Sequence, residues 1–179
     1  MMKRTITFIL IAVFTCSLLM GCVWIPKETV PVSGKEETVK VHLYAADYLG
    51  KTKQEVTTLL GGFAEEMYYN GGMIYRFARS DMWFWFGDDA ASFAATPEGA
   101  ECSFVMAPLS LAADFASYVL SETELSETLG FSFGAPSYNE MDEMYNYIAT
   151  ENGVTCTVSC SEDGIASVKD DYITYMVEK

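Results

Sequence analysis

A ten-residue pattern occurs twice in this chain, and it limits the possible folds more than any other feature of the sequence. Residues 52–61 read TKQEVTTLLG and residues 121–130 read SETELSETLG, so both copies fit [ST]-x-x-E-[VL]-x-x-x-L-G without a gap. The hydroxyl residue and the glutamate three positions later form a capping box, which begins a helix. Apolar residues then recur at helical spacing, and the final glycine favours a helix end. We therefore predict two short helices, each opening one of two repeats.

Strand-forming segments follow each predicted helix. They are rich in β-branched and aromatic residues, and Asn-Gly pairs at 70–71 and 152–153 favour hairpin turns. The segments are 67–69, 73–79, 82–86 and 102–106 in the first repeat, with a loop at 87–101, and 144–149, 154–160, 165–168 and 172–177 in the second. The predicted fold is α+β: two tandem helix-then-antiparallel-meander repeats, residues 39–110 and 111–179, which share one sheet with the helices on one face.

The segment MWFWF at 82–86 does not alternate between apolar and polar residues, as a strand covered on one side should. Either this strand is central and buried on both faces, or one of its faces is an exposed aromatic patch. Exposed aromatic side chains mark binding surfaces, because they bury much area at a small cost in entropy. Under the second alternative Trp83 and Trp85, with nearby Tyr75 or Tyr69, are the anchors for a protein partner.

The N-terminus carries the features of a lipoprotein signal. Two basic residues precede a charge-free, mostly apolar run at 6–20, which is shorter than the roughly 20 residues that span a membrane but suits a secretory signal. The sequence LMGC at 19–22 resembles the lipobox of bacterial lipoproteins, although methionine is a less usual occupant of its second position. We predict that residues 1–21 are a signal peptide, that Cys22 carries the lipid, and that residues 22–38 form a flexible tether.

The charge of the chain excludes one class of partner. Without the two basic residues of the signal, 9 basic side chains of the original 11 face 25 acidic ones, a net charge of −16. Such a surface repels nucleic acid and anionic headgroups. We therefore expect no nucleic-acid partner, and we expect the lipid to hold the protein at the cell membrane on its extracytoplasmic side.

Three cysteines remain after Cys16 leaves with the signal and Cys22 is lipidated. Export permits disulfides. Cys156 and Cys160 lie about 13 Å apart at the rise of a strand, which is too far for them to pair directly. Cys102 can bridge to either of them if the fold brings them close, and three free buried thiols are the equal alternative.

No constellation of residues for catalysis, a metal or a cofactor stands out. His42 is the only histidine, and it lies in an alternating strand-like run without a nucleophile motif to partner it. A zinc site would need His42 and all three remaining cysteines to converge, and the acidic pairs lack the spacing of a calcium loop. We therefore predict that the protein is not an enzyme and that it holds neither metal nor cofactor.

The segment LGKTKQEVTTLLG at 49–61 resembles the opening motif of two related families, the SmpA/OmlA (BamE) outer-membrane lipoproteins and the tandem-repeat β-lactamase-inhibitory proteins. Both use a Gly-x-Thr-x-x-x-Val turn and helix that ends in Leu-Gly. The second copy departs from the motif, because Val119 stands where Gly50 stands in the first. The resemblance covers about 47–87 and 117–177, in pattern rather than identity.

The resemblance implies a binding protein rather than an enzyme. In the inhibitory family two such units form a concave, aromatic-lined sheet that grips another protein, and in the SmpA-like family one unit helps to assemble an envelope complex. Inhibition of β-lactamases itself is not carried over, because it depends on loop residues that have no match here. We expect a lipid-anchored, non-catalytic protein that binds an unknown protein partner. The alternatives are a structural envelope-assembly lipoprotein and a small-ligand receptor.

Overall fold

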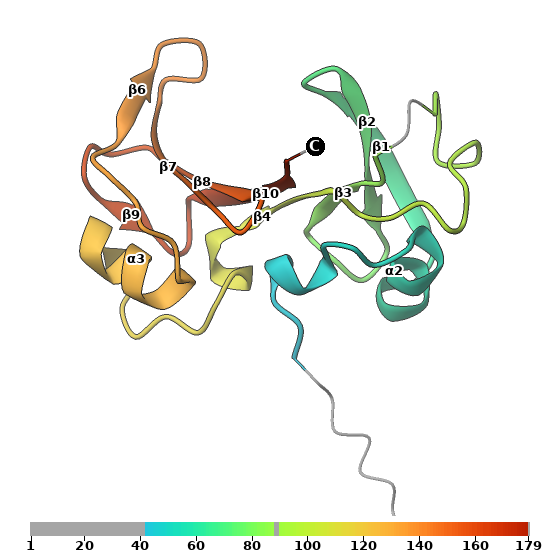
Figure 1. Ribbon diagram of the computed structural model, residues 1–179, viewed down its shortest axis with the longest axis horizontal. Coiled ribbons are helices and arrows are strands. Elements are labelled where there is room, and N and C mark those ends of the chain that lie inside the picture. The colour runs from blue at the N-terminus through green and yellow to red at the C-terminus, as the bar shows by residue number, and fades with distance from the viewer. Residues whose placement is uncertain (1–41, 88–89, 179) are drawn as a thin grey trace, which may run out of the picture. The chain divides into compact units, whose positions relative to one another are not determined.

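The computed structural model describes residues 42–87 and 90–178 (Figure 1). The predicted signal peptide, the lipidation site Cys22 and the predicted tether lie outside these residues, so they stay predictions. Over the described ranges, none of the helices has the length and the apolar character that crossing a membrane requires.

Both predicted helices form where the sequence pattern begins. Helix α2 (Lys53–Leu60) starts after Thr52, whose hydroxyl accepts a hydrogen bond from the Glu55 backbone N–H at 3.3 Å. The Glu55 carboxylate accepts from the Thr52 N–H at 2.8 Å, which completes the capping box and lowers the pKa of Glu55. Gly61 follows the helix at a φ of 84°, which a residue with a Cβ rarely adopts.

Helix α3 (Glu122–Leu129) repeats this arrangement. The Ser121 hydroxyl accepts from the Glu124 N–H at 3.4 Å, and the Glu124 carboxylate accepts from the Ser121 N–H at 2.8 Å. Gly130 ends the helix in the left-handed conformation, at a φ of 72°. Two short 3₁₀ helices that the sequence pattern did not predict, η1 (Ala45–Tyr48) and η2 (Leu109–Leu111), complete the helical part of the described structure.

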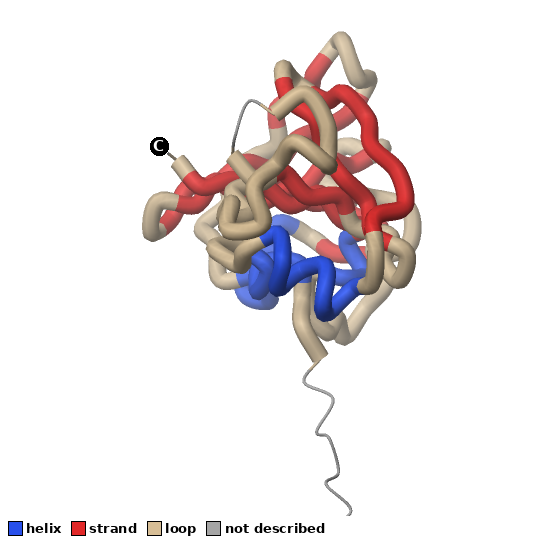
Figure 2. Tube along the Cα trace, turned by 90° about the vertical axis from the view of Figure 1, so that its right-hand side faces the viewer, coloured by secondary structure: helices blue, strands red, loops and turns tan. Residues whose placement is uncertain are grey.

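Eight strands form one antiparallel sheet, which confirms the α+β class. Its strands, in spatial order, are β1 (Phe63–Tyr69), β2 (Gly72–Phe77), β3 (Trp83–Trp85), β4 (Phe104–Pro108), β10 (Tyr172–Val177), β8 (Val154–Cys160), β7 (Met144–Glu151) and β6 (Ser137–Asn139). Strands β4 and β10 pair at the centre, with Val105 opposite Tyr175. The helices lie on one side of this sheet (Figure 2).

Both Asn-Gly pairs make the hairpin turns that the sequence predicts. Asn70 and Gly71 have φ values of 44° and 92° between β1 and β2, and Asn152 and Gly153 have φ values of 53° and 76° between β7 and β8. Positive φ at both central residues is the geometry whose twist matches that of the flanking strands. These local signals therefore set the register of two hairpins.

The segment 165–168 differs from its prediction as part of the main meander. It forms β9 (Ala166–Ser167), which pairs with β5 (Val119–Leu120) in a separate two-stranded sheet. The carboxylate of Asp171, only 2% exposed, accepts hydrogen bonds from the backbone N–H groups of Ser161 at 3.2 Å and Ser167 at 2.6 Å. Asp171 thus joins Ser161, at the end of β8, to Ser167 in β9. In the main sheet β10, rather than β9, is the neighbour of β8.

The hydrophobic core lies between the sheet and the helices. Helix α2 contributes Val56 and Leu60 to it, and α3 contributes Leu125, which is fully buried. Alternate residues of the central strands, such as Val105 and Tyr175, face these helices. Because side chains alternate along a strand, the other residues of each strand project from the opposite side of the sheet.

Candidate functional site

Strand β3 combines the two alternatives that its sequence left open. It is central in position, between β2 and β4, and Phe84 is fully buried in the core with Met82 and Phe86. Trp83 and Trp85 project from the other side of the sheet and are half-buried. One face of this aromatic strand is therefore structural, and the other remains partly accessible.

The side of the sheet away from the helices is here called the open face. The strand register places Trp83 beside Met106 and Trp85 beside Phe104 on this side. Its apolar half consists of Met67, Tyr69, Ile74, Trp83, Trp85, Phe104, Met106, Tyr172 and Met176. Its other half is mainly hydroxyl and amide side chains, namely Ser137, Asn146, Thr150, Thr155, Thr157, Ser159 and Thr174, with Ile148 among them. The two halves of the face thus differ in chemistry.

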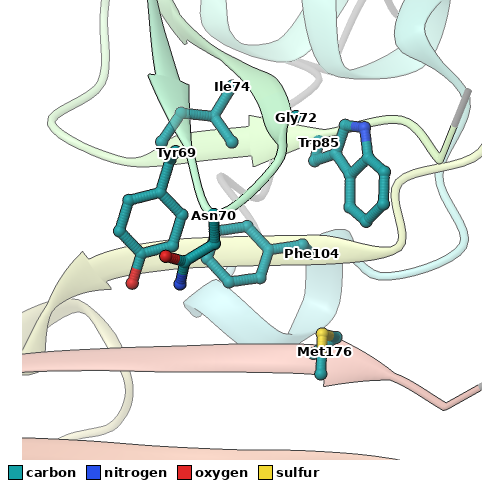
Figure 3. A pocket seen from close by; sticks show the side chains of 7 residues that line it. All are labelled: Tyr69, Asn70, Gly72, Ile74, Trp85, Phe104 and Met176. Atoms are coloured by element: carbon teal, nitrogen blue, oxygen red, sulfur yellow. The ribbon is translucent and has the colours of Figure 1, made fainter. Parts of the chain in front are cut away.

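A small pocket opens in the apolar half, as Figure 3 shows. It has a volume of about 80 Å³ and is lined by Tyr69, Asn70, Gly72, Ile74, Trp85, Phe104 and Met176. The rings of Tyr69 and Phe104 lie 5.7 Å apart between centroids. A Cβ on Gly72 would meet the Trp85 indole at 3.4 Å, so the glycine lets this indole lie close against the backbone of β2.

Three of the four predicted anchors lie on the open face, and one does not. Trp83, Trp85 and Tyr69 project from it, but Tyr75 points into the helix-covered core, where it is 2% exposed. The Tyr75 hydroxyl lies 3.1 Å from the Thr96 hydroxyl. The assignment of Tyr75 is corrected by the strand alternation, because Tyr75 pairs with Phe84 and shares its side of the sheet.

An ion pair and one further carboxylate contribute charge at the apolar half of the open face. Arg76 forms an ion pair with Glu65, and its guanidinium lies 6.0 Å from the centre of the Trp83 ring. Burial raises the pKa of Tyr69, and the nearby charge of Asp142 raises it further. Arg76 is therefore already paired with a carboxylate. The charge of Asp142, from the β6–β7 connection, acts instead on Tyr69 at the edge of the pocket.

Lys53 is a buried cation that no sequence motif singles out. Its side chain is 3% exposed, and its Nζ donates to the carbonyl oxygens of Phe93 at 2.9 Å and Thr96 at 2.7 Å. The same nitrogen pairs with Glu98 at 2.9 Å and lies 4.2 Å from the centre of the Phe93 ring. Lys53 thus fastens the loop before β4 to the start of α2.

The three remaining cysteines are free and buried. Cys156 lies opposite Tyr175, and Tyr175 lies opposite Val105, so β10 separates β8 from β4. Two strand spacings amount to about 9.5 Å, beyond the ~7 Å between Cα atoms that a disulfide tolerates. Cys102 precedes Val105 by three residues, and Cys160 lies farther away still along β8. The predicted bridge from Cys102 to either partner does not form.

Burial also makes these thiols unreactive. Desolvation raises the pKa of Cys102, Cys156 and Cys160 to about 12 in each case. Only the thiolate reacts, so about one thiol in 10,000 is reactive at pH 8. We expect iodoacetamide at pH 8 to leave all three unmodified in the folded chain from residue 22 with Cys22→Ser. In 8 M urea mass spectrometry should find three adducts, and any adduct formed rapidly without urea would contradict the burial.

Residues 42–87 and 90–178 show no cluster of metal-ligating side chains. His42 is exposed, with its ring edge-on to Tyr44 at 4.9 Å. No group of three or more His, Cys, Asp or Glu side chains gathers as metal ligands within these ranges. A wider, open hollow of about 410 Å³ lies at the turn after β2 and includes Arg76, Arg79 and Asp81. The apolar half of the open face, with its aromatic-lined pocket, is therefore the candidate functional site.

Of the seven residues that line the pocket, the sequence prediction placed only Tyr69 and Trp85 on a binding surface. Ile74 and Tyr75 are neighbours on β2, so their side chains project to opposite sides of the sheet. Once Tyr75 is assigned to the core, this alternation places Ile74 on the open face. Phe104 and Met176 carry no such signal, because they lie 72 residues apart and meet through the pairing of β4 with β10. The two strands are far apart in the sequence, and no local motif specifies that they pair.

Comparisons of the chain with protein-family models, with curated proteins and with solved structures find no match in any of the three. The resemblance of residues 49–61 to the two lipoprotein and inhibitor families therefore stays a prediction.

Proposed function

We propose that this chain is a lipid-anchored, non-catalytic extracytoplasmic protein that binds another protein through its open face. The observation that carries the proposal is the position of Trp83 and Trp85, half-buried beside a pocket on the side of the sheet away from the helices. Large aromatic side chains at the centre of such a surface are typical anchors of protein interfaces. Trp83, Trp85 and Tyr69 supply the anchoring aromatic area.

We further propose that the sheet is assembled from two tandem repeats, each a helix followed by a meander. The strand order supports this division, because β1 to β4 lie on one side of the centre and β10, β8, β7 and β6 lie on the other. With one capped helix from each repeat on the same side, the opposite side is left to a partner.

The size of the aromatic pocket favours a protein partner over a small ligand. Pockets that enclose small molecules measure about 300–1,000 Å³, and this one measures about 80 Å³. A shallow pocket in a broad apolar surface suits one side chain of a larger partner. The surplus of 25 acidic over 11 basic residues in the whole chain disfavours nucleic acid and supports attachment through lipid on Cys22.

The test is to compare the proteins that co-purify from membranes of the source cells with the tagged wild-type chain and with Trp83→Ala/Trp85→Ala. We expect the partner to be lost by more than about tenfold, because hot-spot tryptophans each contribute about 2 kcal/mol or more. The matched control is Tyr118→Ala/Val119→Ala, which removes two apolar side chains that are 69% and 57% exposed at β5.

Thermal unfolding must show that the double tryptophan variant still folds. Loss of the fold in that variant would overturn the proposal, because the two indoles would then be structural. Equal capture by the wild type and the tryptophan variant, with integral envelope proteins as the captured set, would support the alternative of a structural envelope-assembly lipoprotein.

A further inference from the structure

An acidic hairpin rises on the same side of the sheet as the pocket of the open face (Figure 1). The β6–β7 connection carries Glu140, Asp142 and Glu143, and Met141 between them is 92% exposed. The side-chain N–H of Asn139 donates to the Asp142 carboxylate at 2.8 Å, which holds that carboxylate in place. Figure 1 shows the β1–β2 and β6–β7 connections rising on the side of the sheet away from α2 and α3.

The charge around the pocket is one-sided. After burial, the negative charge of Asp142 is the second cause that raises the pKa of Tyr69, a residue of the pocket wall. Arg76 is the cation among the described residues of the open face, and Glu65 already pairs with it. Neither ion pair found in the described part of the chain involves the acidic hairpin. A partner that approaches the pocket therefore meets uncompensated negative charge.

The volume of the pocket limits what enters it. At about 80 Å³ it matches nearly three water molecules at ~30 Å³ each, whereas an apolar cavity that holds a benzene ring measures about 150 Å³. A four-carbon aliphatic side chain fits this space better than an aromatic ring. The walls suit it, because Trp85, Phe104 and Met176 present apolar surface to the opening.

We propose that the partner inserts a leucine- or isoleucine-sized side chain into this pocket and sets a lysine or arginine beside it against the acidic hairpin. This inference rests on the proposed function and specifies the chemistry of its partner. The aliphatic side chain supplies the apolar contact, and the cation supplies orientation and discrimination against acidic partners. The occupant is therefore a protruding, basic loop of a protein.

Three capped tripeptides serve as probes: acetyl-Lys-Leu-Lys-amide, acetyl-Glu-Leu-Glu-amide and acetyl-Lys-Ala-Lys-amide. The protein is the chain from residue 22 with Cys22→Ser, which contains every residue of the described core from Ala45 to Tyr175. NMR spectra report the indole N–H of Trp85 and the methyl group of Met176 during titration. We expect the Lys-Leu-Lys peptide to shift both signals and to bind at least about threefold more tightly than either other peptide.

Two neutralising double variants locate the charge effect. Asp142→Asn/Glu143→Gln should abolish the preference for the Lys-Leu-Lys over the Glu-Leu-Glu peptide, while it retains an acceptor for Asn139. Glu162→Gln/Asp163→Asn removes two exposed carboxylates at the start of the β8–β9 excursion and should leave the preference unchanged. The two variants change the net charge equally, so a difference between them reports position.

Equal binding of the Lys-Leu-Lys and Glu-Leu-Glu peptides would overturn the inference, and so would shifts that avoid Trp85 and Met176. Shifts at Trp83 without a charge preference would overturn it too, but would leave the proposed function standing, because that proposal requires only the open face. Conversely, peptide selectivity together with undiminished partner capture by Trp83→Ala/Trp85→Ala would remove the proposed function and keep the pocket chemistry.

Discussion

Replacing Lys53 with methionine is expected to lower the free energy of unfolding by about 2–4 kcal/mol. The Nζ of Lys53 satisfies the carbonyl oxygens of Phe93 and Thr96 and pairs with Glu98. Methionine fills much of the same space but donates no hydrogen bond, so two loop carbonyls lose their partner. Each such loss in a buried place costs about 1–3 kcal/mol.

Urea unfolding followed by circular dichroism measures this effect, and Glu98→Gln is its matched control. The Glu98 side chain is 66% exposed, so its ion pair is screened by water, and its loss should cost less than about 1 kcal/mol. If the methionine variant were as stable as the wild type, the lysine would not be what fastens the loop at 90–101 to helix α2. A cost equal to that of Glu98→Gln would assign the stability to the ion pair rather than to the carbonyls.

Phe84→Ala is expected to cost about 3–5 kcal/mol of unfolding free energy, and Trp83→Ala less than about 1.5 kcal/mol. The two residues are neighbours on β3, but Phe84 is fully buried and Trp83 is half-buried on the open face. The Phe84 ring meets those of Tyr48 at 5.4 Å and Phe77 at 5.5 Å, so its removal leaves a cavity. Truncating Trp83 instead exposes surface that water can reach.

The same urea experiment on both variants decides this prediction. Similar costs for Phe84→Ala and Trp83→Ala would mean that both faces of β3 are structural, and the aromatic patch would lose its role in binding. The predicted contrast would validate the binding test, because a tryptophan variant that keeps its fold can report on partner capture alone.

Much of the local structure was predictable because the interactions that specify it span only a few residues. Thr52 and Ser121 each satisfy a backbone N–H three residues away, and that contact forms whatever the rest of the chain does. Asn70 and Asn152 accept a positive φ in the same local way. The α+β class follows from these helices and hairpins.

The candidate site was predictable only in part. Trp83 and Trp85 are recognisable as candidate anchors because they are tryptophans, but the sequence alone left open whether they face the core or water. Tyr75 was misassigned to the binding surface, because its face depends on the register between β2 and β3. The proposed bridge from Cys102 failed for a related reason, since β10 lies between the strands that it would join.

The sequence by itself determined where the helices begin and end and where two hairpins turn, since caps and turns depend on contacts between near neighbours. Only the tertiary structure decided which side of β3 meets the helices, that Phe104 and Met176 close the pocket, and that the cation of Lys53 is buried. These outcomes depend on pairings between residues 19 to 72 positions apart. Such pairings form through the burial of apolar area over the whole sheet, which no short motif encodes.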